Sequence, residues 1–320
     1  VRLKNIPAAP AAMEREVFNF GTESDPDWDT YTLITEAQQF VDIGADKAKW
    51  NQNYVLGNDI DLESRNDVKV IEDFNGKFIG NGHSIKNVYI NEPEKSEVAL
   101  FGEVNSGSVI RDLTLDGGSI YGKKSVGGIA AVNNGSLINC TSSCSVSGEF
   151  GYVGGVCAYS EGTLISCRNT GSVSYTPGTH YEDGIIGGVC GYNGGKISGC
   201  YNSGTVEGLE HAGGVCGISS DGEIENCYNS GAVSGTTKVR LTGTLTDGDH
   251  YIVTPESADK SAFSYLGEMV FAVKTVDGLY HWFLQDAPSP APDPTPTPTP
   301  SPAPAPAPSR KDIVINISVG

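Results

Sequence analysis

Eight cysteines between residues 140 and 227 have the most evident chemical potential in this chain, since thiolates bind metals, form disulfides and act as nucleophiles. Seven of them recur in two series, and in an earlier unit of the sequence Leu113 and Ala130 occupy the corresponding positions. Replacement by apolar residues indicates small, buried hydrophobic side chains. Because no Cys-x-x-Cys pair and no cysteine–histidine pattern with zinc spacing is present, we expect neither a metal nor another cofactor. The two series are Cys140, Cys167, Cys200 and Cys227, and Cys157, Cys190 and Cys216.

Disulfide bonds are the alternative for these cysteines. Equivalent cysteines of neighbouring units would lie about 4.8 Å apart, within the Cα range of a disulfide, but their parallel side-chain directions oppose the bond. Cys144 stands outside both series and is the cysteine most expected to form a disulfide, with Cys140 as its candidate partner.

Known catalytic motifs are missing from the sequence. It contains no HExxH metallopeptidase motif, no GxSxG nucleophile motif and no phosphate-binding loop, and its five histidines are scattered. We therefore expect a protein without catalytic residues. A polysaccharide-cleaving lyase or hydrolase is the alternative from a different functional class, and Glu182→Gln would abolish cleavage by such an enzyme.

Aromatic, acidic and histidine side chains gather just before the Gly-Gly pairs at 154–155, 187–188 and 213–214. Because the pairs recur at corresponding positions of a repeated unit, we expect the preceding residues along one edge of the fold, where loops on a rigid scaffold carry binding residues. Aromatic rings there would stack on a glycan or protein ligand, and carboxylates would accept its hydrogen bonds; an ordinary solvated corner is the alternative. The candidate ligand-binding residues are Phe150, Tyr152, His180, Tyr181, Glu182, Asp183, Glu210 and His211.

The unit that positions these residues is written four times between Asn134 and Gly235, in phrases such as GTLISCRNTGSVSY and GKISGCYNSGTVEG. Corresponding cysteines of the first series are 27, 33 and 27 residues apart. A unit of about 27 residues accommodates three short strands with their turns, and like residues of successive units then stack in ladders. We therefore predict an all-β fold, a right-handed parallel β-helix with three sides and about 27 residues per coil. Three Asn-x-Gly triplets are predicted to form turns that need a left-handed residue, and they begin at Asn169, Asn202 and Asn229.

The flanking segments are predicted to cap this solenoid or to connect it to other domains. Leu33–Trp50 has apolar residues at helical spacing and a capping box of Thr35 and Gln38, which predicts a short N-terminal capping helix. Strand patterns around Asp277-Gly278 predict a β-rich C-terminal cap, and proline at every second position from 288 to 308 predicts an extended linker. The predicted organisation is a leader or the end of a preceding domain at 1–30, a capped β-helix at 31–235, the C-terminal cap at 236–286, the Pro-rich linker at 287–309 and the start of a following domain or tail at 310–320.

Several of these phrases together resemble the GLUG-repeat proteins. The motifs are NDIDL, FNGKFIGNGHSIKNVYI and LFGEV, followed by a series of VGG…NxG…C units, and they cover about Tyr54–Gly235. The resemblance implies a parallel β-helix in a bacterial surface or secreted protein. Such repeats occur in adhesin-like proteins and in non-catalytic parts of some IgA-cleaving metallopeptidases, so the resemblance is specific for the architecture and leaves both of these settings open.

Charge and hydropathy limit the possible partners and location. The formal net charge of −18 argues against nucleic acid and anionic membrane surfaces as partners, and no apolar run is long enough for a transmembrane helix, so we expect no membrane insertion in this segment. We expect Val1 to begin a mature protein or an excised fragment. The predicted function is that of a monomeric, adhesin-like module, secreted or on a bacterial cell surface, that binds a host or microbial glycan or protein; an accessory domain of a larger secreted metallopeptidase is a further alternative.

Overall fold

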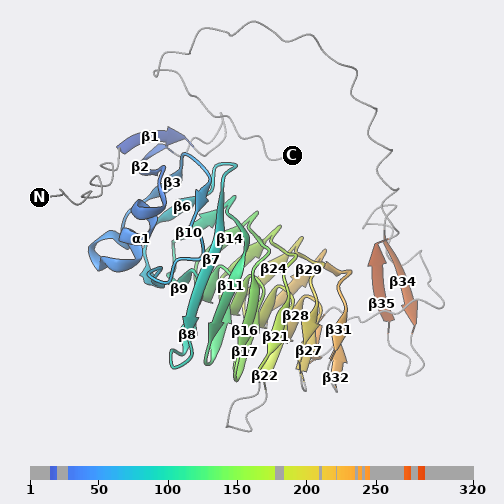
Figure 1. The fold of residues 1–320 in the computed structure, drawn as a ribbon. Helices are drawn as coiled ribbons and strands as arrows, with labels where there is room; N and C mark the ends of the chain where they lie inside the picture. Colours follow the sequence, from blue (N-terminus) through green and yellow to red (C-terminus); the bar gives the residue numbers. More distant parts are fainter. Residues whose placement is uncertain are drawn as a thin grey trace, which may run out of the picture.

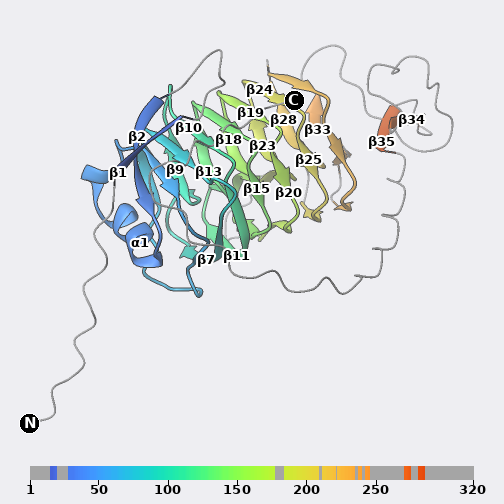
Figure 2. The same ribbon diagram turned by 90° about the horizontal axis from the view of Figure 1, so that it is seen from above.

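The computed structural model describes residues 15–19, 28–176, 184–208, 211–220, 222–234, 237–239, 242–245, 270–274 and 280–284. Strands of successive coils stack side by side from the blue N-terminal end to the orange strands in Figure 1, and Figure 2 shows the same stack from above. Apart from the N-terminal pair β1–β2 and the hairpin β34–β35, all strand pairs are parallel. The predicted parallel β-solenoid is confirmed.

From the second coil on, each coil contributes strands to four sheets, which we call A, B, D and C in the order in which the chain visits them. Sheet A contains β1 Arg15–Asn19, β2 Trp28–Ile34, β3 Tyr54–Leu56, β6 Lys77–Ile79, β10 Val109–Arg111, β14 Ser136–Ile138, β19 Thr163–Ile165, β24 Lys196–Ser198 and β29 Glu223–Glu225. Sheet B contains β4 Ile60–Asp61, β7 Ser84–Glu92, β11 Thr114–Gly122, β15 Thr141–Ser142, β16 Ser145–Gly148, β20 Arg168–Asn169, β21 Val173–Tyr175, β25 Tyr201–Asn202, β26 Val206–Glu207, β30 Tyr228–Asn229 and β31 Val233–Ser234.

The remaining two sheets follow sheet B in each coil. Sheet D contains β8 Glu97–Val98, β12 Ser125–Gly127, β17 Gly151–Gly154, β22 Gly184–Gly187, β27 His211–Gly213 and β32 Thr237–Val239. Sheet C contains β5 Ile71–Phe74, β9 Phe101–Val104, β13 Ala130–Asn133, β18 Cys157–Ser160, β23 Cys190–Asn193, β28 Cys216–Ser219 and β33 Thr242–Leu245.

A Gly-Gly pair accounts for the fourth sheet where three sides were predicted. In the coil of β17 and β18, a Cβ atom on Gly154 would lie 1.9 Å from the carbonyl oxygen of Cys157, and one on Gly155 would lie 2.3 Å from that of Gly188. Only glycine permits such close backbone contact, so one side of the coil is divided into two short strands at this corner.

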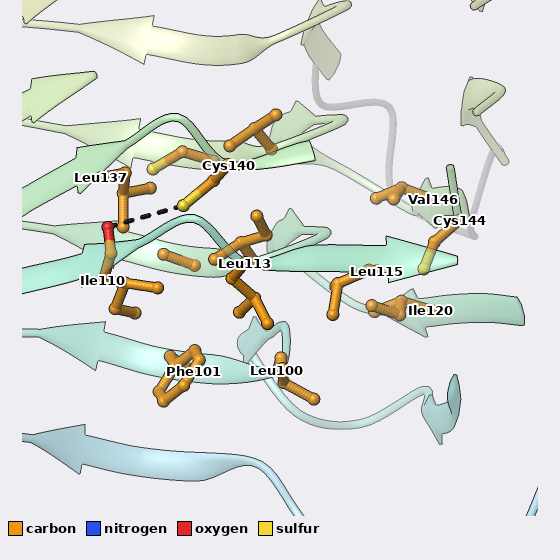
Figure 3. Packing of buried hydrophobic residues seen from close by; sticks show 14 of the residues in the cluster. Leu100, Phe101, Ile110, Leu113, Leu115, Ile120, Leu137, Cys140, Cys144 and Val146 are labelled. Carbon is orange, nitrogen blue, oxygen red and sulfur yellow. Dashed lines mark hydrogen bonds between the residues drawn. The ribbon is translucent and has the colours of Figure 1, made fainter. Parts of the chain in front are cut away.

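The inward-facing residues form the predicted ladders. Ile110, Leu137 and Leu164 are paired in register, and so are Cys157 and Cys190. Figure 3 shows Leu113 and Cys140 in the core, with the Cys140 thiol reaching the carbonyl oxygen of Ile110 at 3.5 Å. These stacked side chains remove apolar area from water along the whole solenoid.

The cysteines are free thiols, and all except the half-buried Cys227 are buried. Burial raises the pKa of Cys144 to about 12 and also raises that of Cys157, so both thiols stay protonated. The alternative of a disulfide at Cys144 does not occur in the structure, where Cys144 is a free thiol whose Sγ donates to the carbonyl oxygen of Gly117 at 3.1 Å.

The sequence predicted left-handed turns at the three Asn-x-Gly triplets, and this prediction is wrong. The three asparagines lie in strands of sheet B and are buried. The side-chain amide of each donates to the carbonyl oxygen of the glycine two residues later in the chain. In the first two, the amide also donates to the asparagine of the next coil. The left-handed residues of the neighbouring corner are instead Asp112, Asn139, Ser166, Gly199 and Asn226. The amide ladder consists of Asn169, Asn202 and Asn229.

The N-terminal cap combines a helix with two strands. The helix α1 covers Ala37–Ala45, and a 3₁₀ turn follows at Lys47–Lys49. The predicted helix began too early, because Leu33 and Ile34 extend sheet A as part of β2. The capping residue is likewise shifted by one position: the Oε1 atom of Gln39, not a side chain of Gln38, accepts from the backbone N–H groups of Thr35 and Glu36.

At the other end, the ladders continue beyond Gly235. Strands β32 and β33 pair in parallel with β27 and β28, and β34 Val270–Lys274 pairs with β35 Tyr280–Leu284 as the predicted antiparallel hairpin. The Pro-rich segment 287–309 and the run 310–320 lie outside the described residues.

Candidate functional site

Three of the eight candidate ligand-binding residues lie in the described part of the chain. Phe150 follows β16 at the turn into sheet D, where its backbone N–H donates to the Lys123 carbonyl oxygen at 3.0 Å. Tyr152 and His211 lie in β17 and β27. His180, Tyr181, Glu182, Asp183 and Glu210 lie outside the described residues, so the grouping of all eight stays a prediction.

Tyr152 and His211 share one column on sheet D. Tyr152 pairs with Ile185, and Ile185 pairs with His211 in the next coil. All three side chains are half-buried. The structure therefore brings these two predicted residues onto one face, with an isoleucine between them.

Tyr152 also contacts two tyrosines of sheet C that the sequence did not single out. Tyr159 and Tyr192 lie in paired positions of β18 and β23, and their rings stack with centroids 4.7 Å apart at 4°. The Tyr152 ring is tilted against both, at centroid distances of 5.5 Å and 5.3 Å. We call Tyr152, Tyr159 and Tyr192 the tyrosine cluster. The sequence carries a signal for it, since a tyrosine stands two residues after Cys157 and Cys190 in the phrases VCAYS and VCGYN.

The cluster forms because sheets C and D approach each other closely on the outside of the coil. A Cβ atom on Gly191 would lie 2.6 Å from the Ala158 carbonyl oxygen, 2.9 Å from the Val153 nitrogen and 3.1 Å from the Tyr152 Cβ. The Tyr152 side chain thus lies over a residue that must be glycine. The two sheets meet along an outward-facing surface, which we call the C–D corner.

Hydrogen bonding and burial further stabilise the neutral form of the tyrosines. The Tyr159 hydroxyl donates to a Glu161 carboxylate oxygen, and this bond raises the pKa of Tyr159 to about 12. Burial raises the pKa of Tyr152 as well. At physiological pH the cluster presents neutral rings beside one carboxylate, a surface that suits ring stacking and hydrogen bonding to hydroxyl or amide groups.

We expect Glu161→Ala to lower the pKa of Tyr159 towards the ordinary tyrosine value of about 10. Since the folded-state pKa is raised, the contribution of this hydrogen bond to stability is complete below about pH 10 and is lost as the pH rises through the folded value of about 12. NMR titration of tyrosines labelled with ¹³C at Cζ measures the change. An unaltered titration of Tyr159 in the variant would contradict the assignment.

A pocket of about 340 Å³ opens in the C–D corner nearer the N-terminus. It is lined by Glu72, Lys95, Ser96, Glu97 and Gly102, and Lys95 forms an ion pair with Glu72. Glu97 pairs with Ser125, which is buried, and the strand of Ser125 pairs with the strand of Tyr152. The pocket and the tyrosine cluster therefore lie on the same two sheets.

Among the described residues, no group of three or more His, Cys, Asp or Glu side chains is arranged to hold a metal ion. Nor is any described helix both long and apolar enough to cross a membrane.

Similarities to known proteins agree with this architecture. The family described as the GLUG motif matches residues 208–234. Halomucin of Haloquadratum walsbyi is 38% identical over 77 residues, which make up 24% of this chain and 1% of halomucin. The crystal structure of a candidate immunoglobulin A1 protease from Bacteroides ovatus is similar with a TM-score of 0.50 at 19% identity, covering 83% of this chain and 94% of that chain. An IgA1 protease structure gives a TM-score of 0.42 at 14% identity, covering 73% of this chain and 23% of that chain.

Two of these similarities support the repeat and the fold. The chain carries the GLUG motif that its sequence resembled, and the candidate protease from Bacteroides ovatus shares the solenoid fold. The chain spans only a very small part of halomucin.

Proposed function

We propose that this GLUG-repeat solenoid is a non-catalytic recognition module of an exported bacterial protein, and that it binds a glycan or a protein through the C–D corner. The tyrosine cluster is the observation that carries the proposal. Its three rings contact one another with centroids 4.7 to 5.5 Å apart, and all three side chains are half-buried. Rigid tyrosines offer a large contact area at low conformational entropy cost, which is why they are enriched at binding sites.

The other candidate ligand-binding residues are the second part of this proposal. Phe150 and His211 flank the cluster along the chain, and His180, Tyr181, Glu182 and Asp183 precede β22 in the sequence, as Glu210 precedes β27. We propose that these side chains contact the parts of a ligand that extend beyond the tyrosines. The module would act as a monomer, on the cell surface or in the surroundings of the cell.

An accessory domain of a larger secreted protein is the setting we propose for the module. The GLUG motif and the fold shared with a candidate immunoglobulin A1 protease support this setting. A peptidase activity would then belong to another part of the parent protein, where an HExxH motif would identify it.

Replacement of Tyr152 by Ala should weaken binding at least tenfold, because it removes the ring that contacts both other tyrosines. The measurement is binding of the purified chain to a glycan array and to immobilised host and microbial surface proteins. Tyr89→Ala is the matched control, since Tyr89 is 36% exposed on sheet B, away from the C–D corner. Equal binding by the two variants would exclude the tyrosine cluster as the site.

A further inference from the structure

We propose that the ligand of the C–D corner is an uncharged glycan chain that lies along the solenoid axis, from the tyrosine cluster to the pocket at Glu72 and Glu97. This inference rests on the proposed recognition function and adds the chemical class and the direction of the ligand. The sequence analysis proposed a ligand for Tyr152 but did not connect it to a second contact at Glu72 and Glu97.

The lining of the corner is continuous from coil to coil. On sheet C, Glu103 pairs with Val132, Val132 with Tyr159, and Tyr159 with Tyr192. The pocket lies at β8 and β9 and the cluster begins at β17 and β18, so they are two coil steps, about 10 Å, apart. A ligand that contacts both is therefore longer than one sugar ring or one side chain.

The pocket lies at the end of sheet D, whose first described strand is β8. Over Gly191 the Tyr152 side chain from the preceding coil fills the corner, whereas the side chain nearest to a Cβ atom on Gly102 is the smaller Val70, with its Cγ1 at 3.2 Å. The resulting volume of about 340 Å³ is at the lower end of the range for small-ligand pockets, about 300–1,000 Å³. It has room for a terminal sugar unit.

The hydrogen-bonding state of the two sheets favours a glycan over an extended peptide. Strands β17 and β18 are each paired on both sides, by β12 and β22 and by β13 and β23. Among the described strands, the free edge of sheet D lies at β8, beside the pocket, and a peptide strand added there would run parallel to β8, across the solenoid axis. Beside the tyrosine cluster its main chain would have no ladder to join. A sugar needs none, because its C–H faces pack on aromatic rings and its hydroxyls bond to side-chain acceptors such as Glu97 and Glu103.

The negative charge of the protein favours uncharged glycans over anionic ones. Three carboxylates line or adjoin the path, those of Glu72, Glu97 and Glu103. Glu72 forms ion pairs with Lys95 and Lys47, so Glu97 and Glu103 carry the negative charge of the path. The whole chain has a formal net charge of −18. Uronate, sialylated and sulfated chains would approach against this potential, so an uncharged chain is the ligand that fits.

The test is binding of the full chain to an array of neutral, sialylated, sulfated and uronate-bearing glycans, followed by calorimetry with the best-bound neutral chain at two lengths. We expect the hits to be neutral glycans, with a hexasaccharide bound at least tenfold more tightly than the disaccharide because only the longer chain spans both ends. Tyr152→Ala and Tyr192→Ala should each weaken hexasaccharide binding at least tenfold, while Tyr89→Ala leaves it within twofold. Glu97→Lys should strengthen binding of a hexauronate chain at least fivefold.

The outcomes separate this inference from the function on which it rests. Preference for anionic glycans, equal binding of disaccharide and hexasaccharide, or capture of a protein in place of any glycan would overturn the inference, while loss of that binding in Tyr152→Ala would leave the recognition function standing. A change in the sedimentation coefficient of the free chain on Tyr152→Ala would identify the corner as a self-association surface and would also overturn it. If the chain binds no glycan and no surface protein, both proposals are wrong.

Discussion

Phe78→Ala should lower the free energy of unfolding by about 3–5 kcal/mol, the usual cost of removing a large aromatic side chain from a packed core. Phe78 is fully buried, and its ring contacts those of Phe40 at 6.2 Å, Tyr54 at 6.2 Å and Phe101 at 5.4 Å. Phe40 belongs to helix α1, while the other two lie in sheets A and C. The substitution therefore leaves a cavity where the N-terminal cap meets the first coils.

Urea unfolding followed by circular dichroism measures this effect, and hydrogen exchange locates it. Because each coil of a solenoid is stabilised mainly by its neighbours, exchange should increase first in residues 31–104. Val17→Ala is the control, since Val17 is 64% exposed and surface substitutions usually change stability by less than about 0.5 kcal/mol. A loss below about 1 kcal/mol for Phe78→Ala would mean that the cap does not depend on this aromatic core.

Asn202→Ala should lower the free energy of unfolding by about 3 kcal/mol or more, because it leaves several buried polar groups without partners at about 1–3 kcal/mol each. The Asn202 amide accepts from Asn169 at 2.8 Å and donates to Asn229 at 2.7 Å. It also bonds to the backbone of Gly204, donating to the carbonyl oxygen at 2.9 Å and accepting from the N–H at 3.2 Å. Loss of one side chain thus interrupts a ladder that joins three coils.

The same unfolding experiment tests Asn202, with Asn58→Ala as its matched control. Asn58 is exposed and makes one side-chain hydrogen bond, to the Thr35 carbonyl oxygen at 3.2 Å, so its replacement should cost less than about 1 kcal/mol. Equal effects of the two substitutions would show that the amide ladder adds nothing beyond an exposed hydrogen bond.

The outward-facing residues explain why the sequence predicted only part of the site. Inward positions repeat the same residue types, so the alignment of Cys157, Cys190 and Cys216 could be read directly from the sequence and is confirmed by strand pairing. Outward positions vary from coil to coil, and the contact of Tyr152 with Tyr192 joins residues 40 positions apart on two different sheets. Nothing in the local sequence states the angle between those sheets, which depends on the backbone contact at Gly191.

The asparagines and the cap illustrate the same limit at a smaller scale. Asn-x-Gly is a turn signal in an isolated segment, but stacking places Asn169 and Asn202 within hydrogen-bonding distance of each other, and the ladder then favours a strand. Leu33 and Ile34 fit a helical pattern, yet they pair with the otherwise open edge of β3 and so belong to sheet A. In both cases a partner from another coil outweighs the local preference.

The parallel solenoid, its period and the residues of its core can be predicted from the amino-acid sequence, because each coil must place the same kinds of side chain in the same ladder to bury them. Which exposed residues meet depends on how the sheets are arranged in three dimensions. The C–D corner, its pocket and its tyrosine cluster follow from the way glycines let two sheets touch, and such long-range contacts leave no periodic trace among the variable residues that make them.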